Sequence, residues 1–233
     1  MSPAKSPPVK NQLLAALPKK DYQALQPHLE EIPLVFDELL YRPNMLINDV
    51  YFPNSGIVSL LAGVNERSTL EVGLVGNEGM VGLGVFLGVE SSLNRAVVQG
   101  AGSAMKMKAT VLRKECNNGG VLPRLLRRYS HSVLTQITQS AVCNRFHSMD
   151  ARMARWLLMT HDRMGEDEFQ ITQEFLSNML GVRREGVSIA AGDLQRRKLI
   201  RYTRGRLEVL DRPGLEATAC GCYEIIRSEP SSS

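Results

Sequence analysis

The residues best suited to chemistry lie in the C-terminal third of the chain, where two arginines and a glutamate stand together. A period of 3.6 residues places Arg184, Glu185, Ser188 and Ile189 on one face of a helix. An arginine can donate two hydrogen bonds to guanine, and a glutamate can accept one from cytosine. Ile189 can offer only an apolar contact, for example to a thymine methyl group. We therefore expect this face to read DNA bases, with Arg183 binding a phosphate.

Apolar spacing divides the surrounding sequence into two helices joined at Gly181. Thr172 is a favourable N-cap for the first helix, and Gly181 permits the positive φ of a tight turn. The inward positions of the second helix are Val187, Ala190, Ala191 and Leu194. This pattern predicts a helix-turn-helix whose second helix can enter a DNA major groove. Thr172 and Gln173, at the start of the first helix, join the predicted DNA contacts.

A short hairpin is predicted directly after the second helix. The segment "TRGR" separates two β runs and places Gly205 at the turn. Arg204 and Arg206 then lie where a wing contacts phosphates or the minor groove. From residue 183 to 206 there are eight Lys/Arg and two acids, in a chain whose net charge is only +4. Such a surface attracts DNA by counterion release, although a solvated helix face or a protein-binding helix-turn-helix is the alternative.

Length and composition describe a globular protein with one or two domains. The 233 residues are 43% hydrophobic and 22% charged, and the four cysteines are too few for a disulfide framework. The first residues lack the apolar core of a signal peptide, and no apolar run approaches the ~20 residues of a membrane span. We expect a cytoplasmic protein without membrane contact. No paired carboxylates or nucleophile–base arrangement stand out, so an enzyme is not expected.

The elements that must position the basic helix follow a clear order. Residues 1–10 are predicted to be a disordered tail, followed by two short helices broken at Pro18. Between residues 31 and 112, short β runs alternate with Gly, Pro and Asn turns, which predicts an all-β roll or sandwich. Residues 121–147 form one long helix whose single apolar stripe indicates self-association. The stripe consists of Leu122, Leu126, Tyr129, Val133, Ile137, Ala141 and Phe146.

We therefore predict an α+β protein with four parts. These are a sensory β-roll (11–120), a dimerisation helix (121–147), a winged helix-turn-helix (150–215), and a C-terminal helical extension with a tail (216–233). This order resembles the Crp/Fnr family of transcription regulators. The resemblance rests on "DARMARWLLM", on "ITQEFLSNMLGVRREGVSIAAGDLQRRKLI", and on "GNEGMVGLGVFLG" followed by "NRAVVQ". It implies a homodimer that binds a palindromic operator and contacts RNA polymerase. It also implies that an effector in the roll repositions the DNA-binding domains.

The same resemblance points to an effector segment in the roll. In cyclic-nucleotide relatives, a glycine-rich turn, a glutamate and an arginine hold the nucleotide. The matching positions here, with a helix residue that would approach the base, are Gly76, Glu78, Gly79, Arg95, Ala96 and Thr138. Ala96 lacks the hydroxyl that the family pattern has after the arginine. A cyclic nucleotide, another small ligand, and no ligand therefore all stay open. A ligand-binding module whose helix-turn-helix contacts proteins is the alternative function.

The spacing of the cysteines does not match a specific metal-binding motif. No cysteine precedes Cys116, which excludes the N-terminal iron–sulfur cluster of the family's oxygen-sensing branch. Cys143 and His147 are four residues apart on a helix, a spacing that serves packing more often than metal binding. Cys220 and Cys222 could be a redox switch or half of a metal site. No metal ligand is assigned on this basis.

Overall fold

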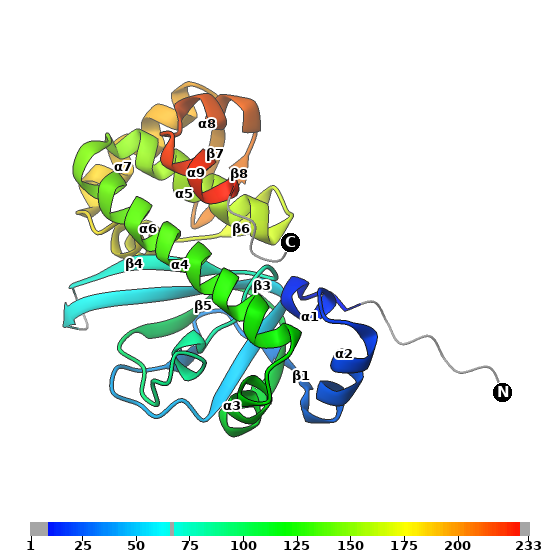
Figure 1. Cartoon of the computed structure of the whole chain (residues 1–233). Coiled ribbons are helices and arrows are strands. Elements are labelled where there is room, and N and C mark those ends of the chain that lie inside the picture. Colours follow the sequence, from blue (N-terminus) through cyan, green and yellow to red (C-terminus); the bar gives the residue numbers. More distant parts are fainter. Residues whose placement is uncertain (1–8, 66–67, 229–233) are drawn as a thin grey trace.

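The computed structural model of the protein describes residues 9–65 and 68–228. Residues 1–8 of the predicted disordered tail and residues 229–233 of the predicted C-terminal tail lie outside the described residues. Figure 1 shows a β-sheet on one side, a group of short helices on the other, and the long helix α4 running along both. The predicted α+β class is confirmed.

Five antiparallel strands form the N-terminal sheet, in the order β1-β5-β3-β4, with β2 also paired to β5. They are β1 (Glu30–Leu34), β2 (Leu39–Tyr41), β3 (Asp49–Asn65), β4 (Ser68–Val75) and β5 (Arg95–Lys108). The predicted alternation of short β runs with Gly, Pro and Asn turns does not hold at residues 53–56, because β3 continues through them. Gly56, with φ 80°, and the shifts of register there form a bulge, which bends a strand without ending its pairing.

Short helices flank the sheet and complete the first hydrophobic core. They are α1 (Gln12–Ala15), α2 (Lys19–Leu25) and α3 (Ala109–Asn117), with 3₁₀ turns at Gln26–His28 and Leu83–Val85. Asn11 is fully buried and caps α1, and its side-chain amide donates to the carbonyls of Pro53 and Gly79 at 2.9 Å. The two bonds from the amide attach α1 to the roll, because a buried amide must keep its partners.

The long helix α4 (Val121–Phe146) divides into two halves with different surroundings. In the first half, Leu122, Leu126 and Tyr129 are buried against the roll. Further along, the buried Gln136 accepts a hydrogen bond from Leu74 N at 2.6 Å and donates to Leu74 O at 3.3 Å. The side chain of Gln136 therefore extends the backbone pairing of β4 onto the helix.

The second half of α4 exposes large apolar side chains. Leu134 is 63% exposed and Phe146 is 73% exposed. Ile137 and Val142 are also exposed on this half of the helix. In a single chain, the long apolar stripe is thus covered at its beginning and open towards its end.

The helix α5 (Met149–Met164) leads into the winged helix-turn-helix, whose elements follow in chain order. They are β6 (Glu168–Gln170), α6 (Gln173–Leu180), α7 (Arg184–Arg196), β7 (Ile200–Thr203) and β8 (Arg206–Val209). The short strand β6 lies in the acidic segment between α5 and α6. The strand forms because Phe169 is buried and pairs opposite Leu207. The second core includes residues of both parts of the chain, such as Trp156 of α5 and Leu74 of β4.

The chain continues beyond the wing as two helices, α8 (Arg212–Thr218) and α9 (Cys222–Ser228). The sequence predicted a helical extension here; the structure divides it into two helices, because the backbone leaves the helix at Ala219 and resumes it at Cys222. Figure 1 shows α9 beside α4, and Tyr223 attaches it to α5. No helix among the described residues is long and apolar enough to cross a membrane.

Candidate nucleic-acid interface

The recognition helix α7 is held by the turn before it and by its apolar inner face. Gly181 ends α6 with φ 62°, and a Cβ there would approach Leu70 Cδ1 of β4 to 2.7 Å. The predicted inward side chains of α7 are all buried, with exposed fractions of 0–2%. They are Val187, Ala190, Ala191 and Leu194. The opposite face of α7 is therefore directed to solvent.

That exposed face contains the predicted base-reading residues, and two of them are paired with α6. Arg184 lies 2.5 Å from a carboxylate oxygen of Glu174, and the Ser188 hydroxyl donates to Gln173 Oε1 at 3.1 Å. Glu185 is exposed, and Ile189 is 67% exposed. An exposed ion pair contributes about 0–1 kcal/mol, so Arg184 can leave Glu174 at little cost when a guanine is offered.

Thr172 has a structural role in addition to its predicted place beside DNA. Its hydroxyl accepts a hydrogen bond from Phe175 N at 3.1 Å, which caps α6. Arg183 is the N-cap residue of α7 but makes no side-chain cap, and its side chain is exposed. Arg183 is thus positioned at the N-terminus of α7, where backbone N–H groups also favour an anion.

The wing is a two-residue hairpin turn with left-handed backbone at both positions. Arg204 has φ 50° and Gly205 has φ 80°, as the tight turn between β7 and β8 requires. Arg204 is exposed at the tip. Arg206 pairs with Glu168 at 3.2 Å across the sheet. The pairing orients Arg206, and Arg204 is the cation at the tip of the wing.

The predicted effector segment is packed against α5. Glu78 accepts hydrogen bonds from Gly76 N at 3.1–3.2 Å and lies 2.8 Å from Arg163 Nε. Gly79 lies against the ring of Tyr129, where a Cβ would come within 2.3 Å of the hydroxyl oxygen. Burial raises the pKa of Tyr129. Arg163 was not predicted as part of this segment, because nothing in the sequence links it to Glu78.

The other predicted effector residues lie apart from this group in their contacts. Arg95 is half-buried at the start of β5 and pairs with Leu61 of β3. Ala96 is buried, and Thr138 is exposed on α4. A cavity of about 50 Å³ adjoins Glu78, Arg163 and Gln136. Small-molecule sites usually hold about 300–1,000 Å³, so a nucleotide would need this cavity to open.

A buried polar network that the sequence did not predict lies where the roll meets α5. The Glu71 carboxyl group is hydrogen-bonded to Trp156 Nε1 at 2.9 Å and to Ser59 Oγ at 2.8 Å. Ser59 also donates to Gln99 at 2.6 Å, and Gln99 donates to Thr160 at 3.3 Å. Burial raises the pKa of Glu71 to about 7. A hydroxyl has one proton, so Ser59 donates to either Glu71 or Gln99 at one time, and a protonated Glu71 can donate to Ser59 in turn.

The structure also brings together the two pairs of cysteine and histidine residues that the sequence left separate. Cys143 and His147, at the end of α4, meet Cys220 and Cys222, before and at the start of α9. The Cys143 and Cys220 sulfurs are 3.4 Å apart. The hydrogen bond from Cys143 lowers the pKa of Cys220 to about 5 and raises that of Cys143. Sequence spacing could not reveal this group, because Cys143 and Cys220 are 77 residues apart.

A roll with a glycine-rich segment, a long helix and a winged helix-turn-helix follow one another along the chain. Residues 151–218 match the family model of the Crp-like helix-turn-helix domain. No curated protein matches the chain in sequence. Residues 151–218 therefore form a Crp-like helix-turn-helix domain, and the predicted resemblance is confirmed there.

Solved structures extend the likeness over most of the chain. FixK2 from Bradyrhizobium japonicum is 17% identical, with a TM-score of 0.70, over 82% of this chain and 98% of that one. The c-di-GMP-responsive regulator CLP from Xanthomonas campestris is 16% identical, with a TM-score of 0.67, over 82% and 99%. A Crp/Fnr-family regulator from Thermus thermophilus is 21% identical, with a TM-score of 0.64, over 86% and 100%. The protein has the fold of Crp/Fnr-type DNA-binding transcription regulators.

Proposed function

We propose that the protein is a homodimeric, sequence-specific transcription regulator that binds a palindromic operator. The observation that supports this most is the exposed face of α7, where Arg184, Glu185 and Ile189 stand free of the domain core. The basic wing lies on the next hairpin, at Arg204. Arg184 and Glu185 supply the donor and acceptor that read a G·C pair, and Ile189 supplies an apolar contact.

Dimerisation would use the open half of α4. Leu134, Ile137, Val142 and Phe146 are exposed in the single chain, and burying them against a second copy would remove apolar surface from water. Two recognition helices in such a dimer would enter major grooves about one helical turn apart. Half-sites at that spacing follow from the two-fold symmetry.

Regulation would enter through the roll. The ion pair between Glu78 and Arg163 joins the predicted effector segment to α5, which is the first helix of the DNA-binding domain. A small ligand that drew Glu78 away would loosen that connection and change the placement of α7. CLP is described as responding to c-di-GMP, which makes a phosphate-bearing ligand the first class to test. RNA polymerase would be the partner at the promoter.

This proposal retains the four-part division into residues 11–120, 121–147, 150–215 and 216–233. It places sensing in the first part, pairing in the second and DNA reading in the third. It describes a cytoplasmic regulator and assigns no catalytic step.

The test begins with selection of DNA from a random pool by the full-length protein, followed by fluorescence anisotropy on the selected site. The Arg184→Ala variant should lose about 1–3 kcal/mol of discrimination at one base pair. The matched control is Arg113→Ala, which removes an equally charged side chain paired with Glu90 on the roll. Selection of no sequence, or unchanged preference in Arg184→Ala, would refute the proposal. Protein capture without DNA affinity would favour a protein-binding helix-turn-helix.

A further inference from the structure

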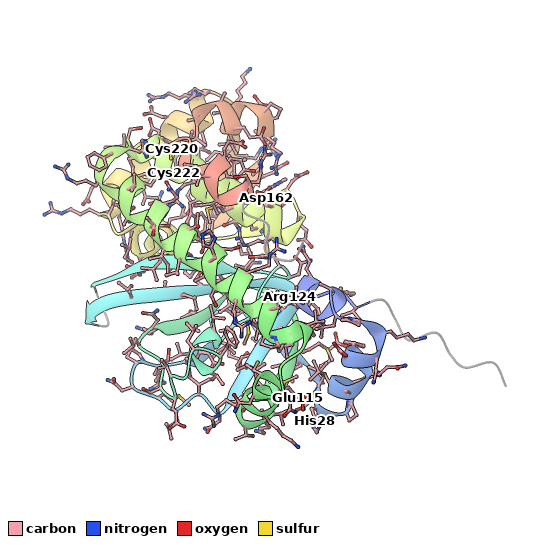
Figure 2. The ribbon with its side chains drawn as sticks, viewed as in Figure 1. His28, Glu115, Arg124, Asp162, Cys220 and Cys222 are labelled. Carbon is pink, nitrogen blue, oxygen red and sulfur yellow. The ribbon has the colours of Figure 1, made fainter. Side chains whose placement is uncertain are left out.

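Four metal-binding side chains meet where α4 ends and α9 begins. The ligand atoms of Cys143, His147, Cys220 and Cys222 all lie within 4.8 Å of one another. The Cys143 and Cys220 sulfurs are 3.4 Å apart, and the Cys222 sulfur is 3.6 Å from His147 Nδ1. Figure 2 shows Cys220 and Cys222 next to the end of α4. Two chain segments thus contribute two ligands each.

Local structure explains why these atoms converge. Cys143 and His147 are four residues apart at the end of α4, which places their side chains one above the other on the same face. Cys220 and Cys222 flank Gly221, which has open space around it. The neighbouring Tyr223 is buried and donates to Asp162 of α5 at 2.8 Å. Tyr223 therefore holds the start of α9 in place without help from the cysteines.

We propose that these four residues bind a single zinc ion as a structural Cys₃His site. In a tetrahedral zinc site with Zn–S of about 2.3 Å and Zn–N of about 2.0–2.1 Å, sulfurs lie about 3.8 Å apart and sulfur lies about 3.6 Å from nitrogen. The Cys222–His147 distance matches this value, and the Cys143–Cys220 distance is a few tenths of an ångström shorter. The two pairs could enclose one ion with small shifts of the side chains.

The donor set favours zinc and a closed site. Soft thiolates with one imidazole select zinc, and four protein ligands leave no open position for a substrate. An iron–sulfur cluster divides its four ligands over two or more irons, so the full set would be spread more widely than these four atoms, which all lie within 4.8 Å of one another. The site is therefore structural in kind.

Two arginines on α5 supply the positive charge that such a site requires. Zinc with three thiolates has a net charge of −1, and a buried charge needs a partner. Arg155 is only 6% exposed, and it makes no ion pair with a carboxylate within the part of the chain that the structure describes. Arg155 and Arg152 both lie within electrostatic range of Cys143, so two cations stand beside the site.

The zinc would fasten the C-terminal extension across the joint between α4 and α5. His147 is the C-cap of α4, and Ser148 is the N-cap of α5. A metal bond from His147 and Cys143 to α9 would therefore restrict the angle at this joint. The winged helix and the dimerisation helix α4 would then move together.

The experiment measures metal content in the full-length protein, purified under reducing conditions and after incubation with Zn²⁺ and dialysis. We expect about one zinc per chain by elemental mass spectrometry. Cobalt replacement should give the visible absorption of tetrahedral cobalt–thiolate. Cys220→Ser and His147→Gln should lose most of the bound metal. Cys116→Ser is the matched control, because Cys116 lies on α3 outside the group and should leave the metal content unchanged.

A variant of the buried Cys143 could fail to fold, so the variants of the half-buried Cys220 and His147 decide the outcome. Circular dichroism confirms that these variants are folded. No metal above the Cys220→Ser background, after incubation with Zn²⁺, would overturn the proposal. Equal metal in all variants would also overturn it. So would a Cys143–Cys220 disulfide found by peptide mapping in fresh protein that does not take up Zn²⁺. Hydrogen exchange of α9 should become faster on zinc removal in the native chain and not in Cys220→Ser.

Discussion

Single side chains with buried polar groups set much of the protein's chemistry. Glu71 lies at the junction of the roll and α5, and its partners are Trp156 and Ser59, with Arg155 and Arg163 near enough to lower its pKa. Burial outweighs these effects and raises the pKa from its ordinary value of 4.5 to about 7. At mildly acidic pH, the Glu71 carboxyl group is therefore protonated in the folded protein.

This shift predicts a pH dependence of stability with a definite sign. Between pH 4.5 and about 7 the unfolded chain has lost the Glu71 proton and the folded chain has kept it. The free energy of unfolding should therefore fall as pH rises through this window, by about 3 kcal/mol in total, and level off above it. Urea unfolding at several pH values would measure this.

Glu71→Gln should remove that component, because the amide stays neutral and can still accept from Trp156 and donate to Ser59. Glu90→Gln is the control, since Glu90 is exposed and pairs only with Arg113 among the described residues. If native protein and Glu71→Gln had parallel pH profiles, Glu71 would not be the titrating group.

Turns and helix ends decide how α7, the proposed DNA-reading helix, is positioned. Gly181 ends α6 with φ 62° and lies against Leu70 of β4, so the same residue makes the turn and permits the contact with the roll. A side chain here would oppose the left-handed backbone and displace Leu70. The link between turn geometry and domain contact could not be seen from the sequence, which indicated the turn alone.

Gly181→Ala should destabilise the protein by about 1–2 kcal/mol, because an L side chain resists the left-handed conformation. Gly192→Ala is a matched control on α7, where nothing lies within 4 Å of the added Cβ. It should stabilise by about 0.5–1 kcal/mol, as alanine does in a helix interior. Thermal and denaturant unfolding of both variants would give the comparison. Equal effects of the two substitutions would contradict the assigned role of Gly181.

In the whole molecule, the second core contains residues of both the sheet and the winged helix, and a few polar contacts also join them. The Glu78–Arg163 pair is the clearest of these, because both side chains are mostly buried and the distance is 2.8 Å. The pair links the segment that resembles an effector site to the helix-turn-helix domain. Such a contact can transmit a signal only if it has measurable coupling energy.

A double-mutant cycle with Glu78→Gln and Arg163→Met should give a coupling of about 1–3 kcal/mol in the free energy of unfolding. The exposed pair Glu90–Arg113, at 3.1 Å, is the control and should give less than about 1 kcal/mol. Similar values for both pairs would mean that Glu78 and Arg163 do not couple the domains.

Dimerisation is tested by changing the open half of α4. Leu134→Glu should shift the molar mass from dimer to monomer in light scattering, because a charge would replace an apolar contact at the proposed seam. Leu93→Glu is the matched control, since Leu93 is 79% exposed but lies on the roll. A native protein that is monomeric, or a Leu134→Glu variant that stays dimeric, would count against this interface.

Elements that depend on local order could be predicted from the amino-acid sequence. Thr172, Gly181 and the spacing of Val187 to Leu194 predict the helix-turn-helix, because caps, turns and periodicity act within a few residues. The same reasoning located the wing at Gly205 and the long helix at 121–147. It failed at β3, where the turn residues around Gly56 form a bulge because β5 continues to pair beside them.

Which distant side chains meet depends instead on the three-dimensional packing. Glu78 forms an ion pair with Arg163, and Glu71 is hydrogen-bonded to Trp156. Cys143 and His147 lie beside Cys220 and Cys222. Each of these contacts joins segments at least 70 residues apart, so no local period or spacing encodes it. Packing of α5 and α9 against the sheet and α4 brings them together, and that packing depends on the whole core.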